Sequence, residues 1–399
     1  MLATRQPVRT RKAMVVSRED HATRAGLRAL EQGGNAVDAA VAVGFALAVT
    51  HPSAGNIGGG GFMLIRFADG RSTFIDFRER APEKAARDMY LDAAGNVTDD
   101  RIIGYRAAGV PGTVRGLEYA AKKYGRRPWA SLLEPAVELA DKGFPVSYGL
   151  SRSLRSKLLA RFPDSRRIFQ RDGKHFEPGE TLAQPELAAT LRRIAQLGSR
   201  DFYEGESARR LADDMARHGG LITLEDLRQY QPVEREPLRG SYRGYDLLIA
   251  PPPSSGGVGV LQMLNMLDRS GYQKAGAGSA ATIHYIAETM RRFFADRARY
   301  FGDPDFVRVP VAELVSPAYA QSRRAGIRVD RATPSAEIGP GLPPASESAE
   351  TTHYSVVDAE GNAVAVTYTL NGGYGSGVTA GGAGFLLNNE MDDFTSKPG

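Results

Sequence analysis

The sequence predicts an α+β protein, because windows with helical periodicity and windows with strand-like alternation occupy separate parts of the chain. Three features carry this prediction. Residues 36–50 form an apolar run with the length of one buried helix, and residues 110–230 carry apolar side chains mainly at helical spacing. Two further stretches, 62–77 and 351–369, each have the pattern of a β-hairpin.

Several helices and strands can be predicted from the residues at their ends. Residues 22–32 are predicted to form a helix that stops at Gly33 and Gly34, because glycine tolerates the left-handed conformation found after helix ends. Strands are predicted at 62–67 and 72–77, since Asp69-Gly70 between them is typical of a hairpin turn. The later predicted elements are strand-like residues 238–249, a proline-rich turn at 251–257 that opens a helix, and a charged helix at 285–300.

Residues 333–350 differ in composition from the rest of the chain. They are rich in Pro, Gly, Ser, Ala and Glu, so we expect them to be mobile and exposed. Directly after them, residues 351–357 and 363–369 alternate as two strands around a turn at 358–362. A flexible segment therefore meets a hairpin between Glu350 and Thr351. From composition alone, a domain linker is the ordinary interpretation.

The composition excludes several classes of site. The 399 residues include no cysteine, which excludes disulfides, thiolate zinc sites, iron–sulfur clusters and a cysteine nucleophile. The 6 histidines show no HExxH or HxH spacing, so a metal site built from histidines is not expected. With 42% hydrophobic residues, the chain is expected to bury a sizeable core.

The charge pattern does not favour nucleic acid or a membrane as a partner. The net charge is +5, but the basic residues are spread along the chain and form no long run. The apolar run 36–50 contains Asp38 and is shorter than the roughly 20 residues that span a bilayer. No signal peptide is visible at the N-terminus. Residues 351–399 hold five acids and one base, net −4, which leaves +9 for the first 350 residues.

A glycine run and a group of acidic residues each have the appearance of a binding motif. The glycine run 58–61 lacks the Lys-Ser/Thr pair of a P-loop and is followed, not preceded, by a strand, so we predict a tight, close-packed turn. The acids Glu390, Asp392 and Asp393 lack the spacing of a calcium loop. Metal binding, binding of a substrate ammonium group and simple solvation remain alternatives for them. No GxSxG motif of a serine hydrolase is present.

With these motifs excluded, the remaining candidates for catalysis are threonine hydroxyl groups in the second predicted hairpin. Thr351 and Thr352 begin one strand, and Thr367 and Thr369 lie near the end of the other. A threonine hydroxyl is a poor nucleophile unless a base lies beside it. The residue's own α-amine, with a pKa of about 7.7–8.0, is suited to that task near neutral pH. This amine exists only when the bond before the threonine is cut.

In these features the chain resembles the γ-glutamyltranspeptidases of the N-terminal-nucleophile hydrolase superfamily. The eight residues from Thr351 to Asp358 are similar to the N-terminus that family members expose after self-cleavage. Further similar motifs follow in family order from about Ala13 to Gly399: His51-Pro52-Ser53 with the glycines to Gly61, Asp76-Phe77-Arg78-Glu79 with Ala81-Pro82, Gly109-Val110-Pro111-Gly112-Thr113, Pro251 to Gly257, Gly302-Asp303-Pro304, and Leu386 to Phe394.

The resemblance implies a four-layer αββα sandwich translated as one precursor. Autoproteolysis between Glu350 and Thr351 would divide it into a large-subunit region, residues 1–350 with a mobile linker at about 333–350, and a small-subunit region starting at 351–399. The two products would stay together as a heterodimer. The family pattern continues past Gly399, into a Ser-Ser pair that binds a carboxylate and a Gly-Gly pair that forms the oxyanion hole. The chain is therefore expected to be C-terminally incomplete and of low activity alone.

The resemblance also implies γ-glutamyltransferase and glutathione hydrolase activity. Thr351 would take the γ-glutamyl group from glutathione or another γ-glutamyl compound and pass it to an amino acid, a dipeptide or water. No cofactor, metal or nucleic acid is expected, and the location would be periplasmic or extracellular, without excluding the cytoplasm. The implied site consists of Thr369 hydrogen-bonded to the nucleophile, Arg78 on the donor's α-carboxylate, and Asn371, Glu390 and Asp393 on its α-ammonium.

Other interpretations of the same residues stay open. Arg78 at a strand end would merely pair with Glu79, and Asp393 would be a surface acid or a helix cap. His353 lies two residues after Thr351 on the same strand face and is interpreted as structural. The alternative functions are a related cephalosporin or glutaryl acylase and an uncleaved, inactive scaffold.

Overall fold

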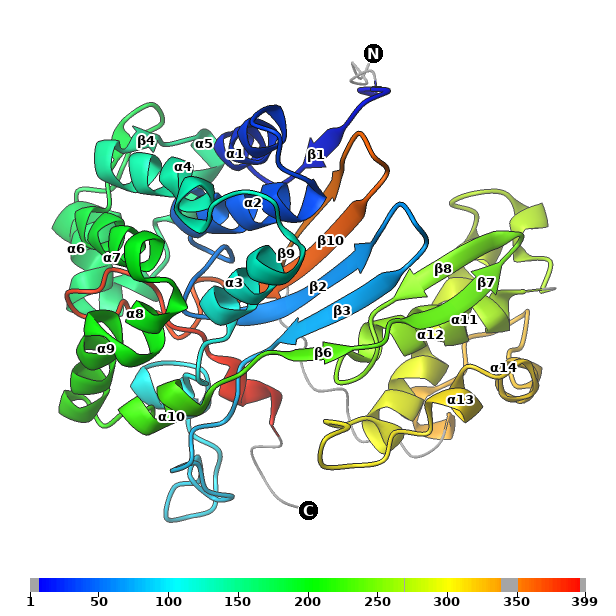
Figure 1. Cartoon of the computed structure of the whole chain (residues 1–399). Helices are drawn as coiled ribbons and strands as arrows, with labels where there is room; N and C mark the ends of the chain where they lie inside the picture. The colour runs from blue at the N-terminus through cyan, green and yellow to red at the C-terminus, as the bar shows by residue number, and fades with distance from the viewer. Residues whose placement is uncertain (1–6, 269, 339–350, 395–399) are drawn as a thin grey trace. The chain divides into compact units, whose positions relative to one another are not determined.

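The computed structural model describes residues 7–268, 270–338 and 351–394 (Figure 1). The chain forms two compact units. One consists of Met1–Glu234 together with Ser348–Gly399, and the other of Arg235–Glu347. The residues of the predicted site that the structure describes all belong to the first unit.

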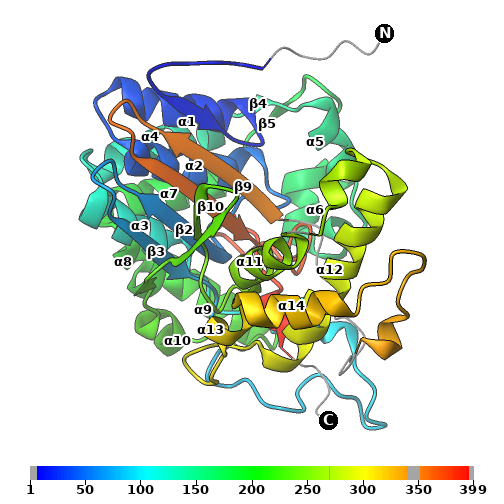
Figure 2. The same ribbon diagram turned by 90° about the vertical axis from the view of Figure 1, so that its right-hand side faces the viewer.

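A six-stranded sheet is the centre of the first unit, as far as the structure describes the chain. The hairpin β9–β10 comes from the C-terminal part of the chain and lies between β1 and β2, which come from the N-terminal part (Figure 1, Figure 2). The pairs β1–β9, β9–β10, β10–β2 and β2–β3 are antiparallel. In sheet order the strands are β1 (Met14–Val16), β9 (Thr351–Val357), β10 (Ala363–Thr369), β2 (Gly60–Arg66), β3 (Ser72–Phe77) and β6 (Val233–Arg235).

Helix α2 (Ala36–Thr50) packs against the middle of this sheet, and every one of its residues is buried. It contacts β9 and β10, and it is surrounded by α1 (Asp20–Glu31), α3 (Thr113–Tyr124) and α4 (Trp129–Lys142) (Figure 1). A helix that is apolar all round is stable only in such a position. The predicted buried helix is therefore confirmed, with Asn35 as its N-cap in a capping box.

The mainly helical character predicted for residues 110–230 is also confirmed. Besides α3 and α4, this part of the chain contains a short ribbon of β4 (Phe144–Pro145) and β5 (Thr181–Leu182) and the helices α5 (Tyr148–Ser153), α6 (Pro163–Gln170), α7 (Pro185–Leu197), α8 (Ser199–Glu204), α9 (Glu206–Arg217) and α10 (Leu224–Gln229). Short 3₁₀ helices of the first unit lie at Asp99–Arg101, Tyr105–Ala107, Leu159–Arg161, Arg171–Gly173 and Glu390–Asp393.

The hairpin β9–β10 has a buried face and an opposite face. Thr352, Tyr354 and Val356 alternate as buried residues along β9, and Tyr368 of β10 donates a hydrogen bond to the carbonyl of Gly44 in α2 (2.9 Å). Side chains alternate between the two faces of a strand. The odd-numbered residues of both strands, beginning with Thr351, therefore lie on the face turned away from α2.

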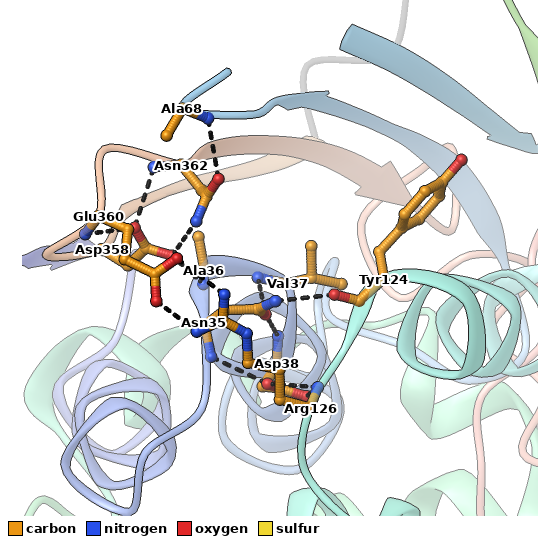
Figure 3. A network of polar contacts seen from close by, with 10 residues as sticks. All are labelled: Asn35, Ala36, Val37, Asp38, Ala68, Tyr124, Arg126, Asp358, Glu360 and Asn362. Atoms are coloured by element: carbon orange, nitrogen blue, oxygen red, sulfur yellow. Dashed lines mark hydrogen bonds and ion pairs between the residues drawn. The ribbon is translucent and has the colours of Figure 1, made fainter. Parts of the chain in front are cut away.

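A polar network anchors the turn of this hairpin to the start of α2 (Figure 3). The Asp358 carboxylate accepts hydrogen bonds from the backbone N–H of Ala36 (2.9 Å) and from the side-chain amide of Asn362 (2.8 Å). Asn362 in turn accepts one from the N–H of Ala68 (2.9 Å), in the turn between β2 and β3. Asp358 is buried, and a carboxylate at a helix N-terminus is stabilised by the helix dipole. The C-terminal hairpin is thus attached to the N-terminal part of the chain by more than strand pairing.

The second unit contains a hairpin and a group of helices. Helix α11 (Ser255–Leu267) packs against α12 (Ala280–Tyr300) and α14 (Pro317–Ala325). The predicted charged helix begins earlier than residue 285, because the side chain of Ser279 accepts a hydrogen bond from Thr282 N–H and caps a helix starting at Ala280. The elements are β7 (Leu238–Tyr242), β8 (Tyr245–Ile249), α11 (Ser255–Leu267), α12 (Ala280–Tyr300), α13 (Val311–Leu314), α14 (Pro317–Ala325) and the 3₁₀ helices Tyr272–Ala275 and Ser335–Glu337.

The predicted α+β class is confirmed. Within the described ranges, no helix has the length and apolar character needed to cross a membrane. Residues 339–350, which include Glu350 and most of the predicted linker, lie outside the described residues. The division at Glu350–Thr351 stays a prediction about the products of cleavage. The compact units divide the chain elsewhere, because its N-terminal and C-terminal segments share one sheet.

Candidate active site

The predicted nucleophile lies beside a second threonine at one end of the central hairpin. Thr351 is the exposed first residue of β9, and its directly opposite partner is Thr369, the last residue of β10. Side chains of directly opposite residues point to the same face, with Cβ atoms about 4.5–5.5 Å apart. The structure therefore brings the two threonines together on the face that is turned away from α2.

Thr369 is held from several sides and is only 6% exposed. Its Oγ1 accepts a hydrogen bond from the backbone N–H of Asn371 (2.9 Å), and its carbonyl accepts one from the Asn56 side chain (2.8 Å). A Cβ at Gly59 would lie 2.1 Å from that same carbonyl oxygen, and one at Gly58 would lie 2.1 Å from the carbonyl oxygen of Leu386. The predicted tight, close-packed turn in the glycine run is confirmed, since only glycine lets these backbones approach.

Arg78 directly follows β3 and reaches the same face of the sheet. Its backbone carbonyl accepts a hydrogen bond from Tyr230 OH (2.8 Å), and its guanidinium lies over the ring of Phe62, 5.7 Å from the centroid. Phe62 is the strand partner of Thr367, so its side chain lies on the face that carries Thr351. The guanidinium is therefore placed on the face of the nucleophile.

The acidic group after residue 389 is divided between two arginines. Glu390 and Asp393 both form ion pairs with Arg78, whereas Asp392 pairs with Arg101. In the part of the chain that the structure describes, no three His, Asp or Glu side chains are arranged to hold a metal ion. The two acids of the predicted site are thus the two that contact the predicted carboxylate-binding arginine.

Asn371 links the threonines to this acidic segment. It adopts a left-handed conformation (φ 73°), which asparagine tolerates better than most residues. Its side-chain amide donates a hydrogen bond to the carbonyl of Asn389 (3.0 Å), while its N–H contacts Thr369. Every predicted site residue except Glu350 is therefore found in one connected region of the first unit.

A family model for gamma-glutamyltranspeptidase matches residues 22–399. The chain belongs to the gamma-glutamyltranspeptidase family. It is 50% identical to a glutathione hydrolase proenzyme of Escherichia coli over 98% of this chain and 68% of that protein. It is 42% identical to an acylase proenzyme of a Pseudomonas species over 99% of this chain and 72% of that protein. The crystal structure of Helicobacter pylori gamma-glutamyltranspeptidase is similar with a TM-score of 0.82, at 43% identity, covering 86% of this chain and 100% of that chain.

In this member of the gamma-glutamyltranspeptidase family, burial and neighbouring charges shift the pKa values of Arg78 and of two carboxyl groups near it. Burial raises the pKa of Glu390 well above its usual range, and Glu79 raises it further. Burial also raises the pKa of Glu79 to about 7, against the opposing effect of Arg78. Burial alone would lower the pKa of Arg78, but Glu390, Glu79 and Asp393 together raise it. The guanidinium therefore stays charged, whereas burial favours the neutral forms of Glu79 and Glu390.

Glu79 is a residue whose importance the sequence did not indicate, beyond its position next to Arg78. Both of its carboxyl oxygens are buried, and neither has a hydrogen-bond partner among the described residues. A Cβ at Gly60 would lie 2.5 Å from Glu79 Oε2. The simple Arg78–Glu79 pair is not what the structure contains, because Arg78 is ion-paired with Glu390 and Asp393.

We predict that Glu79→Gln makes the folded protein less sensitive to rising pH. The pKa of Glu79 is raised in the folded state from 4.5 to about 7, so its contribution to stability is present below pH 4.5 and is lost as the pH rises through about 7. Between pH 5 and pH 8 the melting temperature of the variant should fall less than that of the wild type, by about 2–4 °C. The exposed Glu31→Gln serves as the control and should follow the wild type. Equal pH dependence of all three proteins would contradict the prediction.

His353 is occupied within the hairpin. Its Nδ1 lies 2.8 Å from Thr367 Oγ1 and its Nε2 lies 3.2 Å from Ser355 Oγ. Burial lowers the pKa of this imidazole, so the neutral form is favoured. Both ring nitrogens have partners other than Thr351, which agrees with the interpretation of His353 as structural.

Proposed function

We propose that the protein hydrolyses and transfers γ-glutamyl groups, with glutathione and other γ-glutamyl compounds as donors and Thr351 as the nucleophile. One observation carries the proposal. Thr351 lies opposite Thr369 on the sheet face where the guanidinium of Arg78 meets the carboxylates of Glu390 and Asp393. A nucleophile beside one guanidinium and two carboxyl groups suits a substrate with a zwitterionic head group.

The first step of the proposed reaction is self-cleavage. Thr351 Oγ attacks the carbonyl carbon of Glu350, and the peptide C–N bond breaks. An ester between Glu350 and Thr351 Oγ forms, and the hydroxyl proton passes to the released α-amine of Thr351. Water hydrolyses this ester and leaves two chains. The exposed position of Thr351 at the start of β9 supports this step, because the ester on its hydroxyl would be open to water.

Donor binding exchanges the ionic partners in the site. The α-carboxylate of the donor takes the place of protein carboxylates on Arg78, whose planar guanidinium suits carboxylate recognition. The α-ammonium then binds Glu390 and Asp393, with Asn371 beside them. Glu390 Oε2 is buried and has no hydrogen-bond partner among the described residues, so an ammonium N–H would satisfy it.

Turnover uses the amine that cleavage exposes. The α-amine of Thr351, with a reference pKa of about 7.7–8.0, accepts the proton of its own hydroxyl as Oγ attacks the γ-carbonyl of the donor. The leaving amine of the donor takes that proton, and a γ-glutamyl ester remains on Thr351. Water, an amino acid or a dipeptide then attacks the ester. Thr369 is proposed to hydrogen-bond Thr351 Oγ throughout.

The two products of cleavage are proposed to remain associated. The hairpin β9–β10 lies between β1 and β2, and Asp358 caps α2, so separation would break the central sheet. A periplasmic or extracellular location is proposed from the family resemblance alone.

The proposal is tested by comparing rates on a γ-glutamyl anilide and a glutaryl anilide. The two donors share the terminal carboxylate, but only the first carries the ammonium that Glu390 and Asp393 would bind. We expect a preference for the γ-glutamyl anilide, and stimulation by a dipeptide acceptor if transfer occurs. A preference for the glutaryl anilide would instead favour an acylase, the activity named for the Pseudomonas relative.

A further inference from the structure

Asn388 is a buried amide in which all hydrogen-bonding groups of the side chain are used. It is 0% exposed. Its Nδ2 donates to the carbonyls of Gly58 (2.9 Å) and Gly109 (2.8 Å), and its Oδ1 accepts from the backbone N–H of Gly109 (2.9 Å) and of Glu390 (3.0 Å). One side chain therefore joins three segments that are far apart in the sequence.

Each of these three segments borders the site. Gly58 begins the glycine run that leads into β2 and contacts the segment before Asn388. A Cβ at Gly109 would lie 3.1 Å from the Cβ of Glu79. Glu390 is the first residue of the 3₁₀ helix Glu390–Asp393 and one of the two acids on Arg78.

The hydrogen bond to Glu390 has a specific consequence for that helix. The first N–H groups of a helix have no partner within it, and the N-cap residue of this helix makes no side-chain capping hydrogen bond. Asn388 Oδ1 supplies the acceptor for the N–H of Glu390. It thereby fixes the backbone from which the Glu390 carboxylate extends toward Arg78.

We infer that Asn388 is a positioning residue for donor recognition: it holds Glu390 where its carboxylate meets the α-ammonium of the donor. The inference rests on the proposed function and adds a determinant of donor specificity. Asn388 acts directly on the ammonium half of the site, because its Oδ1 binds the N–H of Glu390. Arg78 is held separately, by its place after β3 and by the Tyr230 hydroxyl, and it is linked to Asn388 only through its ion pair with Glu390. If Asn388 only stabilised the fold, its replacement would lower kcat/KM for all donors alike.

The test is a comparison of kcat/KM for γ-glutamyl and glutaryl anilides in Asn388→Ala. We expect kcat/KM for the γ-glutamyl donor to fall roughly tenfold or more, because a displaced Glu390 weakens the charged hydrogen bond to the donor's ammonium group. With the glutaryl donor, kcat/KM should change by less than about threefold. The loss should appear mainly in KM. Asn35→Ala is the matched control, because Asn35 is also a buried asparagine with several hydrogen bonds, but it caps the far end of α2.

Two further variants keep the test decisive. Asn388→Asp retains the acceptor toward Glu390 N–H, so it should keep more of the donor preference than Asn388→Ala, and it carries the test if the alanine variant does not fold. In a Glu390→Gln background, Asn388→Ala should cause little further loss of preference, because the group it positions is already changed.

Three outcomes are distinguishable. Selective loss of the γ-glutamyl donor in Asn388→Ala supports the inference. Equal loss of both donors, or additive effects with Glu390→Gln, overturns the inference and leaves the proposed function standing. Absence of a γ-glutamyl preference in the wild type overturns the proposed function and the inference with it.

Discussion

Thr351→Ala is expected to leave the chain uncut between Glu350 and Thr351 and to lower turnover of γ-glutamyl donors by about 10⁴-fold or more. The neighbouring hydroxyl cannot replace the missing one, because Thr369 is only 6% exposed and its Oγ1 accepts the N–H of Asn371. Gel electrophoresis measures the cleavage, and initial rates on a γ-glutamyl anilide measure the turnover. N-terminal sequencing of the smaller wild-type fragment should begin at Thr351, and any other start would remove the mechanism.

Two neighbouring substitutions serve as controls for this prediction. Thr351→Ser keeps a hydroxyl on the same strand position and should still cleave, at a reduced rate. Thr352→Val is nearly isosteric and changes a threonine whose side chain is buried on the α2 side of the hairpin, so it should cleave normally. If Thr351→Ala were cleaved and Thr352→Val were not, Thr352 would be the nucleophile and the assignment to Thr351 would be wrong.

Arg78→Lys is expected to lower kcat/KM by roughly 10- to 100-fold for γ-glutamyl and glutaryl anilides alike. Both donors have the terminal carboxylate that the guanidinium would bind. A lysine ammonium keeps the charge but cannot offer the planar, two-pronged hydrogen bonding of arginine, nor lie over Phe62 in the same way. Steady-state rates on the two donors check this.

The matched control is Arg28→Lys. Arg28 also lies between two carboxylates, those of Glu134 and Glu138, but on the helical side of the first unit. Its replacement should leave both donors unaffected. Selective damage to the γ-glutamyl donor by Arg78→Lys would mean that Arg78 serves the ammonium half of the site, against the proposed assignment.

The strands and the buried helix could be predicted from sequence because their signals are local. Alternation with period two predicts 351–357 and 363–369 with the bounds that the structure has for β9 and β10. A continuous apolar run predicts a helix that must be buried on all sides, and α2 is. The glycine run 58–61 could be interpreted as close packing because no phosphate-binding context surrounds it, although its packing partners could not be named.

The partners of the site residues could not be predicted in this way. Arg78 and Asp393 are 315 positions apart, and an adjacent acid, Glu79, was the simpler partner from sequence. The division of Glu390, Asp392 and Asp393 between Arg78 and Arg101 has no local signal either. The same holds for Asn388, whose side-chain amide makes three hydrogen bonds to backbone groups 279 positions or more away. Motif resemblance indicated which residues matter, but not which atoms touch.

The sequence by itself thus determined the α+β class, the hairpin that begins with Thr351 and the residue types available for chemistry, because periodicity and composition act over neighbouring residues. Only the tertiary structure decided that this C-terminal hairpin lies between β1 and β2, with Thr369 opposite Thr351 and Arg78 on the same face. The physical reason is that strand pairing and the burial of charged groups depend on which distant segments share one core. Patterns among neighbouring residues do not show which distant segments will pair.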